Sequence, residues 1–170
     1  MPHALVVGGS GMLAGLCITL ADGREVTVVG RDPEKLERVA RQDPRIHPLS
    51  VDYEDVPAFT AALRGVVAKR SPITLAVCWI RSWAPQSLLA AADAVTPGGR
   101  LFHVLGSQRS DASETAIEAL RRREELLYRQ VQLGEVVSGE GRRWLTNEEI
   151  ADGVAAAVSA DLPSFLVGTR

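Results

Sequence analysis

The sequence predicts an α/β protein with a three-layer, doubly wound parallel sheet that has helices on both faces. Short β-type apolar runs alternate with helix-like segments along the whole chain, and elements that alternate in this way form parallel sheets. A glycine cluster, Gly8-Gly-Ser-Gly11, directly follows the first apolar run, which is typical of doubly wound folds that bind dinucleotides. We expect about seven strands and, from a length of 170 residues, a single domain over 1–170.

In the first half of the chain, apolar and β-branched runs predict strands over residues 3–7, 25–29, 45–51 and 73–79. Helix-like patterns between them predict helices over residues 12–21, 33–41 and 56–68. Asp32 and Pro33 open the second of these helices, as an N-cap followed by a proline at the first helical position. The fourth run is almost continuously apolar, which indicates a strand buried on both faces.

The second half of the chain continues the alternation. Helices are expected over residues 85–94 and 114–127 and from Thr146 to about residue 158, and strands over 100–105, 131–137 and 165–167. The turn Thr96-Pro-Gly-Gly99 precedes the fifth strand. Thr146 and Glu149 have the spacing of a capping box at the start of the last helix.

Charge and composition exclude several classes of protein. A net charge of −2 gives no general attraction to nucleic acid or to an anionic membrane. No apolar run approaches the ~18 residues of a membrane span, and the N-terminus lacks the basic and apolar regions of a signal peptide. We therefore expect a cytoplasmic protein whose partner is a small-molecule substrate, with no nucleic-acid or membrane partner.

The cysteines and histidines do not indicate a metal site. Cys17 and Cys78 are the only cysteines, and each lies in an apolar segment, so we interpret them as buried, inert thiols. No cysteine or histidine pair has the spacing of zinc ligands. His3, His47 and His103 fall inside predicted strands and are interpreted as core or edge residues, so no metal is expected.

The glycine cluster predicts where a nucleotide would bind. It fits the frames Gly9-x-Gly11-x-x-Ala14 and Gly8-x-x-Gly11-x-x-Ala14. Glycines let the backbone approach a pyrophosphate, and the N–H groups of the next helix point at that anion. This Rossmann-like arrangement assigns the following residues to the cofactor: Gly8, Gly9, Ser10, Gly11, Met12 and Leu13.

The end of the second strand favours NADP(H) over NAD(H). Gly30 occupies the position where an acidic residue would hold the ribose of NAD, and Arg31 follows it, 20 residues after Gly11. A guanidinium group can bind a 2′-phosphate through two hydrogen bonds. Two alternatives remain open: Arg31 is an exposed loop residue and Asp32 only a helix cap, or Asp32 reaches the ribose and NAD is the cofactor.

Asp52 and Tyr53 follow the third predicted strand and are candidates for contact with the adenine. The Asp52 carboxylate can accept a hydrogen bond from the adenine amino group, with Tyr53 beside it. The alternative is that Asp52 is a loop or capping residue.

Several segments together resemble the short-chain dehydrogenase/reductase superfamily, in an atypical and shortened form. They are Gly8-Gly-Ser-Gly-Met-Leu-Ala14, Val29-Gly-Arg-Asp32, Val51-Asp52, Val104-Leu-Gly-Ser107, Tyr128-Arg-Gln-Val-Gln-Leu-Gly134 and Arg143-Trp-Leu-Thr-Asn-Glu-Glu149. The likeness covers nearly the whole chain. It implies a Rossmann-like fold, a nicotinamide cofactor and a carbonyl-type substrate.

The resemblance also implies two catalytic residues. Ser107, after the fifth strand, matches the serine that polarises the substrate carbonyl, and Tyr128 matches the tyrosine that transfers the proton. The lysine four residues after that tyrosine is replaced by Gln132, and Tyr128 lies at the end of its predicted helix. A phenol without this lysine keeps a pKa near ~10 and is a poor base at neutral pH. The alternative is that Ser107 is a helix or turn cap and that Tyr128 is an amphipathic residue packed at a helix end.

The segment after the fourth strand also departs from the family, which has an Asn-Ala-Gly-like loop there. Trp79 is expected to contact the cofactor, Arg81 to hold an anionic group of cofactor or substrate, and Trp83 to wall the substrate pocket. The alternative is a core tryptophan and a solvated Arg81. Only residues 138–145 stand where the family has a long substrate lid, so the substrate is small or partly bound by a partner subunit.

Two functions follow from these observations. The first is an NADP(H)-dependent oxidoreductase that acts on a small carbonyl-type substrate. The alternative is a non-catalytic NADP(H)-binding sensor or regulatory protein that kept the fold and lost the lysine. A homodimer that pairs through the predicted helix over 114–127 is possible in either case.

Overall fold

The computed structural model describes residues 1–8 and 10–170, and within them seven parallel strands form one sheet with the order β3-β2-β1-β4-β5-β6-β9. The strands of this sheet are β1 (His3–Val7), β2 (Glu25–Gly30), β3 (Ile46–Ser50), β4 (Ile73–Trp79), β5 (Val95–Leu105), β6 (Leu127–Leu133) and β9 (Ser164–Val167). The strand order reverses between β1 and β4, as in doubly wound folds. The predicted α/β fold class is confirmed.

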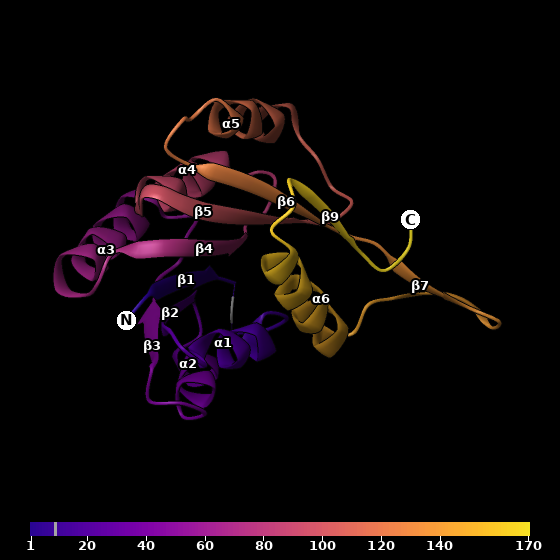
Figure 1. Cartoon of the computed structure of the whole chain (residues 1–170), viewed down its shortest axis with the longest axis horizontal. Coiled ribbons are helices and arrows are strands. Elements are labelled where there is room, and N and C mark those ends of the chain that lie inside the picture. Colours follow the sequence, from indigo (N-terminus) through magenta and orange to yellow (C-terminus); the bar gives the residue numbers. More distant parts are fainter. Residues whose placement is uncertain (9) are drawn as a thin grey trace.

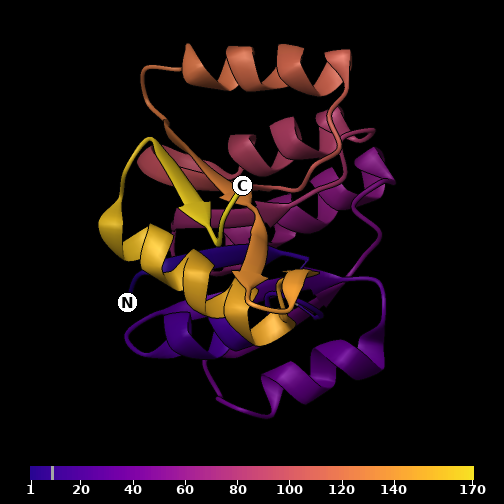
Figure 2. The same ribbon diagram turned by 90° about the vertical axis from the view of Figure 1, so that its right-hand side faces the viewer.

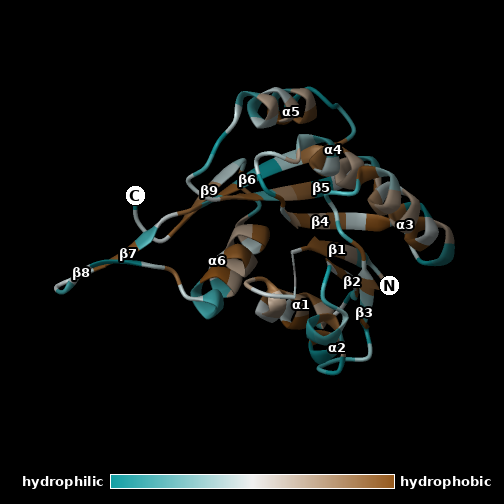
Figure 3. Ribbon diagram, turned by 180° about the vertical axis from the view of Figure 1, so that it is seen from behind, coloured by the Kyte–Doolittle hydropathy of each residue, from teal (hydrophilic) through white to brown (hydrophobic). Residues whose placement is uncertain are grey.

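Helices cover both faces of the sheet (Figures 1 and 2). Their bounds are α1 (Ala14–Ala21), α2 (Pro33–Ala40), α3 (Val56–Lys69), α4 (Pro85–Asp93), α5 (Asp111–Arg121) and α6 (Asn147–Ala160). Helices α1, α2 and α6 share a core with one face of the sheet, and α3, α4 and α5 share a core with the other. Figure 3 shows the apolar strands between these two helical layers.

Capping residues fix the starts of two helices where the sequence predicts them. The Asp32 carboxylate accepts hydrogen bonds from the backbone N–H groups of Glu34 and Lys35 at the start of α2. Thr146 and Glu149 form the expected capping box of α6, each side chain accepting from the backbone N–H of the other. These caps satisfy N–H groups that have no partner inside a helix, which is why the boundaries can be read from the sequence.

The predicted helix over 114–127 and the predicted strand over 131–137 are wrong in their boundaries. Helix α5 ends at Arg121, and β6 begins at Leu127. The charged residues 121–125 extend a helical pattern locally, but parallel pairing with β5 determines where β6 begins, with Leu101 opposite Tyr128. Tyr128 is therefore a strand residue, and it does not lie at a helix end.

The segment after β6 forms a β-hairpin that the sequence did not predict. Strand β7 (Glu135–Ser138) pairs in antiparallel fashion with β8 (Gly141–Trp144), and Gly141, at the start of β8, adopts a φ of 113°. The hairpin projects from the body of the molecule beside β9 (Figure 1). Val137 and Trp144 on it are 52% and 71% exposed. Most of residues 138–145, which stand where the family has a long substrate lid, thus belong to this hairpin.

The two cysteines lie in the hydrophobic core, as predicted, and burial raises the pKa of each thiol to about 12. His3, His47 and His103 lie in β1, β3 and β5, also as predicted. No helix in the described residues combines the length and hydropathy that a bilayer crossing requires. Within residues 1–8 and 10–170, no three His, Cys, Asp or Glu side chains are grouped so that they could hold a metal ion.

Candidate functional site

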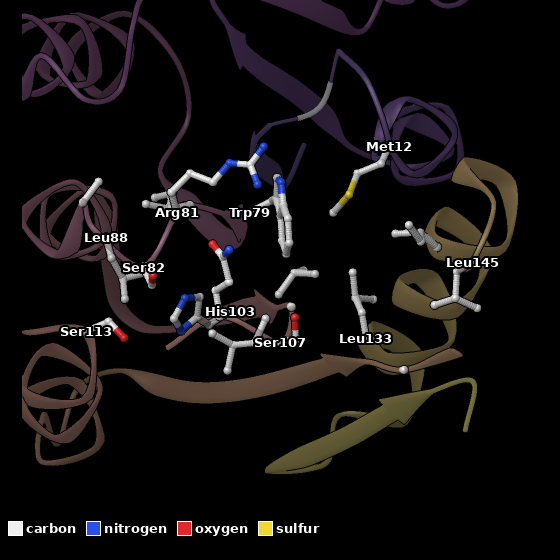
Figure 4. A pocket seen from close by; sticks show the side chains of 18 of the residues that line it. Met12, Trp79, Arg81, Ser82, Leu88, His103, Ser107, Ser113, Leu133 and Leu145 are labelled. Atoms are coloured by element: carbon white, nitrogen blue, oxygen red, sulfur yellow. The ribbon is translucent and has the colours of Figure 1, made fainter. Parts of the chain in front are cut away.

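A cavity of about 340 Å³ lies at the carboxyl ends of the central strands (Figure 4). Its walls come from the glycine turn, from the ends of β4, β5 and β6, from the starts of α4 and α5, and from the segment between β8 and α6. These residues are Met12, Trp79, Ile80, Arg81, Ser82, Ala84, Pro85, Leu88, His103, Val104, Leu105, Gly106, Ser107, Gln108, Ser113, Leu133, Gly134, Trp144, Leu145 and Ile150. Ligands of open α/β sheets bind at this edge.

The glycine turn borders the cavity through Met12. Gly8 adopts a φ of 87°, and its N–H donates to the carbonyl oxygen of Val29 (3.1 Å). A Cβ atom on Gly8 would lie 3.1 Å from both the Cβ atom and the carbonyl oxygen of Trp79, so the backbone of β1 approaches β4 closely here. A Cβ atom on Gly11 would meet no atom of the described residues within 4 Å. Gly11 therefore faces open space.

Helix α1 begins without a side-chain cap, because its N-cap residue is Leu13 and makes no side-chain hydrogen bond. The Leu13 side chain is fully buried in the core, so only its backbone is available to a ligand. A Cβ atom on Gly30 would lie 2.9 Å from the Ser10 hydroxyl oxygen, so the glycine turn packs against the end of β2. Gly9, which was predicted to contact the cofactor, lies outside the described residues.

Arg31 and Asp32 follow β2 at the same edge of the sheet, and both side chains are exposed. The Asp32 carboxylate caps α2 through one of its oxygens, which is one of the two roles that the sequence left open for this residue. Arg31 lies close enough to Tyr53 for its charge to lower the pKa of that phenol, although burial has the larger effect and raises it. A guanidinium group at the end of β2 is thus available to a ligand.

Asp52 and Tyr53 lie after β3, and both are engaged by the protein itself. The Asp52 carboxylate accepts a hydrogen bond from the backbone N–H of Glu54 (2.9 Å). The Tyr53 hydroxyl accepts one from the backbone N–H of Arg81 (3.1 Å), and its ring packs edge-on against Phe59. Neither residue lines the cavity. Tyr53 ties the loop after β3 to the segment after β4.

The segment after β4 places an arginine side chain against two tryptophan rings at the edge of the cavity. The Arg81 guanidinium lies over the rings of Trp79 and Trp83, with its carbon 5.5 and 5.7 Å from the two ring centroids. Trp79 and Arg81 line the cavity. Trp83, which was predicted to wall the pocket, is 59% exposed, donates from its indole N–H to Glu54, and does not line this cavity. Arg81 thus contacts both rings, but only Trp79 reaches the cavity wall.

Ser107 lines the cavity at its exposed side, just after β5. The nearby Gln132, which stands where the resemblance implied a lysine, is on β6 and donates through its side-chain amide to the carbonyl oxygens of Leu105 and Gly106. Its amide oxygen accepts from Arg109 (2.7 Å). Gln132 thus holds the backbone that leads to Ser107.

Tyr128 does not line the cavity, so the structure does not place its phenol beside Ser107. The residue is 8% exposed and lies in the core beneath α5, and its hydroxyl is 2.7 Å from Nδ1 of His103. The side-chain amide of Gln130 donates to the same hydroxyl (3.1 Å). Burial raises the pKa of the phenol to about 12. The phenol that the resemblance implied as the proton-transfer group therefore lies outside the cavity wall, bonded to His103.

Among the cavity residues that sequence reasoning missed are four from elements at the two ends of the cavity. His103 and Ser113 come from β5 and α5, and Trp144 and Leu145 come from the end of the hairpin and the segment after it. The inward direction of His103 follows from the period-2 alternation of β5, but its apolar neighbours favoured a core interpretation. No local signal identifies Trp144, because the hairpin path decides which residues reach the cavity.

No family model matches the chain, and no curated protein matches its sequence. Solved structures do match its fold. An alcohol dehydrogenase from the archaeon Thermococcus sibiricus, complexed with 5-hydroxy-NADP, is similar over 100% of this chain and 96% of its own, with 14% identity and a TM-score of 0.75.

Two further solved structures are also similar in fold over nearly the whole chain. A putative oxidoreductase from Escherichia coli has 15% identity over 99% of this chain and 95% of its own, with a TM-score of 0.76. A short-chain dehydrogenase/reductase from Serratia marcescens has 17% identity over 98% of this chain and 97% of its own, with a TM-score of 0.73. The chain therefore has the Rossmann-like fold of short-chain dehydrogenase/reductases.

Proposed function

We propose that this protein is an NADP(H)-dependent oxidoreductase that acts on a small carbonyl-type substrate. The observation that carries the proposal is the continuous cavity from Met12 beside the glycine turn to the ends of β4, β5 and β6. In doubly wound folds a dinucleotide occupies this edge of the sheet, with its pyrophosphate at the first glycine turn. The similar solved structures include oxidoreductases, which supports a generic role of this kind.

The residues of the glycine turn fit a nicotinamide dinucleotide. The uncapped start of α1 presents backbone N–H groups to an anion, and Gly11 faces open space where a pyrophosphate can approach the backbone. Arg31 is exposed at the end of β2, where it would bind the 2′-phosphate of NADP(H), while Gly30 contributes no competing carboxylate. Asp32 uses its carboxylate to cap α2, which favours NADP(H) over NAD(H).

In the bound state the nicotinamide would supply a hydride to the substrate carbonyl carbon, and solvent water at the open side of the cavity would supply the proton that the carbonyl oxygen takes up. Ser107, exposed at the cavity wall, would donate a hydrogen bond to that carbonyl oxygen. Trp79 would pack against the cofactor, and Arg81 would hold an anionic group of the cofactor or the substrate. The small volume of the cavity agrees with a small substrate.

One observation favours the second function, a non-catalytic NADP(H)-binding sensor or regulatory protein. Neither a tyrosine nor a lysine lines the cavity among the described residues. The family's proton-transfer pair is therefore not present in its usual form. Both proposals require the nucleotide to bind, and they differ only in turnover.

Calorimetric titration with NADPH and NADH tests the shared requirement. We expect NADPH to bind with a Kd below about 1 mM and more tightly than NADH. Arg31→Ala should weaken NADPH binding by about 10- to 100-fold, the equivalent of one charged hydrogen-bonding partner, and leave NADH binding nearly unchanged. Arg38→Ala, which removes an exposed arginine of the neighbouring helix α2, is the matched control.

Turnover then separates the two functions. An oxidoreductase oxidises NADPH in the presence of at least one member of a panel of small aldehydes, ketones and quinones, and Ser107→Ala slows that reaction. Tight NADPH binding without turnover on any acceptor identifies the sensor. If neither nucleotide binds at millimolar concentration, both proposals are wrong.

A further inference from the structure

The end of the cavity nearest α4 and α5 contains polar atoms that the proposed reaction does not use. Ser82 and Leu88 lie on one side of it, and His103 and Ser113 lie opposite (Figure 4). This end is separate from the end formed by Met12, Leu133 and Leu145, which lies nearer the glycine turn. We call the region around His103 and Ser113 the inner end of the cavity.

A chain of hydrogen bonds determines where His103 carries its proton. The Gln130 side-chain amide donates to the Tyr128 hydroxyl oxygen, and the Tyr128 hydroxyl lies 2.7 Å from Nδ1 of His103. Because the Tyr128 oxygen already accepts from Gln130, its own hydrogen is free to be donated to Nδ1 of His103. A neutral imidazole that accepts at Nδ1 carries its hydrogen on Nε2.

Burial keeps the imidazole of His103 neutral. The residue is 2% exposed, and desolvation, followed by the positive charge of Arg109, lowers the pKa of His103 to about 3. At neutral pH the ring therefore offers one donor, the Nε2–H group, and no described residue accepts a hydrogen bond from it.

Ser113 contributes a second polar group without a partner. Its side chain is 4% exposed, and its hydroxyl oxygen is buried with no hydrogen-bond partner among the described residues. Figure 4 shows this hydroxyl turned to the side on which His103 lies. Buried polar atoms in proteins are nearly always paired, so the buried Ser113 hydroxyl indicates a ligand, and the unpartnered Nε2–H of His103 at the same end of the cavity is a second donor to it.

We propose that the inner end of the cavity binds the oxygen atom of a small uncharged ligand, such as a ketone, an aldehyde or a primary amide. His103 Nε2–H and the Ser113 hydroxyl would donate to the two lone pairs of that oxygen. Leu88 and Ala84 provide apolar wall for the hydrocarbon part of the ligand. Tyr128 is a positioning residue, because it holds the imidazole in the tautomer that donates.

The surroundings select a neutral ligand over an anion. The two donors are themselves uncharged, and Arg109, whose charge acts on His103, is already paired with Glu114 (3.4 Å). A carboxylate placed beside the donors would therefore lose more in hydration than it would gain from a countercharge. The nearest cavity-lining cation is Arg81, whose guanidinium stacks on Trp79 and points away from His103 in Figure 4. The binding at the inner end does not depend on a nucleotide or on turnover.

Nitrogen NMR of protein labelled with ¹⁵N at its histidines tests the proposal, with isobutyramide as the probe. Before the probe is added, His103 should show a protonated Nε2 and an unprotonated Nδ1 at pH 7. Isobutyramide should then shift the Nε2 resonance of His103 saturably, and the resonances of His3 and His47 should stay in place. Isobutyrate, which has the same shape and a negative charge, should cause no such shift.

Two serine variants form a matched pair for this measurement. Ser113→Ala should weaken isobutyramide binding about tenfold, as expected for one lost hydrogen bond. Ser87→Ala also removes a buried hydroxyl, on α4, but that hydroxyl donates to the carbonyl oxygen of Tyr53 and does not line the cavity. Ser87→Ala should therefore leave the probe affinity unchanged.

Tyr128→Phe tests the positioning role. Without the phenol, Nδ1 of His103 has no donor, so the nitrogen shifts should move towards a mixture of the two tautomers and the probe affinity should fall. The proposal is overturned if saturating isobutyramide leaves the His103 resonances unmoved, if isobutyrate shifts them as strongly, or if Ser113→Ala binds the probe as tightly as the native protein. The NADPH titration is independent of each of these results.

Discussion

His103 illustrates how a single residue acquires properties that its sequence neighbourhood does not show. It lies within an apolar strand, where a buried structural histidine is the simplest interpretation. The structure confirms the burial but also places the ring at the cavity wall, with Tyr128 bonded behind it. Desolvation lowers the pKa of His103 to about 3, and it also lowers the pKa of His3 in β1.

These shifts predict how stability depends on pH. Because the folded-state pKa values of His103 and His3 lie below the value of ~6.5 in the unfolded chain, the unfolded state binds more protons as the pH falls through 6.5. The contribution of these neutral histidines to the free energy of unfolding is therefore complete above pH 6.5 and is lost progressively as the pH falls towards 3. His103 should contribute a loss of about 2 kcal/mol in the free energy of unfolding between pH 7.5 and pH 5.0.

Urea unfolding at the two pH values measures this loss. His103→Gln keeps an acceptor for Tyr128 and cannot titrate, so its stability should fall less between pH 7.5 and 5.0 than that of the native protein. His47→Gln, a variant of a half-buried histidine paired with Glu25, is the comparison for a non-core site. Equal losses in the native protein and His103→Gln would show that His103 is not held neutral.

Among the elements, the turn between β1 and α1 has the clearest physical requirements. Gly8 has a positive φ and lies against Trp79, whereas Gly11 has open space beyond it and no such backbone constraint. The two glycines are therefore needed for different reasons. Gly8 allows the turn to form, and Gly11 leaves room for a ligand.

Alanine substitutions separate these two roles. Gly8→Ala should destabilise the protein by about 1–2 kcal/mol, because an L-residue is strained at positive φ and its Cβ atom would press on Trp79. Gly11→Ala should leave the unfolding free energy nearly unchanged and weaken NADPH binding by about tenfold or more. Thermal unfolding and calorimetry measure the two effects. Native-like NADPH affinity in Gly11→Ala would mean that the pyrophosphate does not lie over Gly11.

The boundary between α5 and β6 shows why some elements can be predicted from local patterns and others cannot. The starts of α2 and α6 are fixed by Asp32, Thr146 and Glu149, whose side chains bond to backbone groups within four residues. The start of β6 is fixed by pairing with β5, which is distant in sequence. The predicted placement of Tyr128 on a helix failed for this reason.

The cavity is a property of the whole molecule. Met12, Arg81, Ser113 and Leu145 come from widely separated parts of the chain and meet at the carboxyl edge of the sheet. The hairpin of β7 and β8 contributes Trp144, which is 71% exposed and yet forms part of the wall. A side chain with so little burial adds little to folding, so its position at the cavity suggests a contribution to binding.

Trp144→Ala tests this contribution. The variant should change the free energy of unfolding by less than about 0.5 kcal/mol, as is usual for exposed side chains. It should raise the Kd for NADPH or for a substrate about three- to tenfold, because an aromatic side chain no longer covers the ligand. Val137→Ala, on the same hairpin but outside the cavity wall, is the control and should bind NADPH as the native protein does.

Site residues predicted from the ends of strands lie at the cavity, whereas the residue predicted from a family motif does not. Met12, Trp79, Arg81 and Ser107 were assigned from their positions at the ends of β1, β4 and β5, and the structure places them at the cavity. Tyr128 was assigned from resemblance to a helical motif, and the structure places it in a strand beneath α5. The ends of strands can be predicted directly from apolar runs in the sequence. A family motif predicts the position of a side chain only if that side chain lies on the same kind of element, helix or strand, in both proteins.

The order of residues alone was enough to establish the parallel α/β sheet, the glycine turn at its edge and the capped starts of α2 and α6, because each follows from periodicity or from contacts within a few residues. The path of residues 121–145, the neutral and partly unpaired environment of His103, and the group of residues around the cavity depend on β5–β6 pairing and on side chains brought together from distant segments. Burial and charge at such a site exist only once the chain has folded, since desolvation comes from neighbours that are remote in sequence.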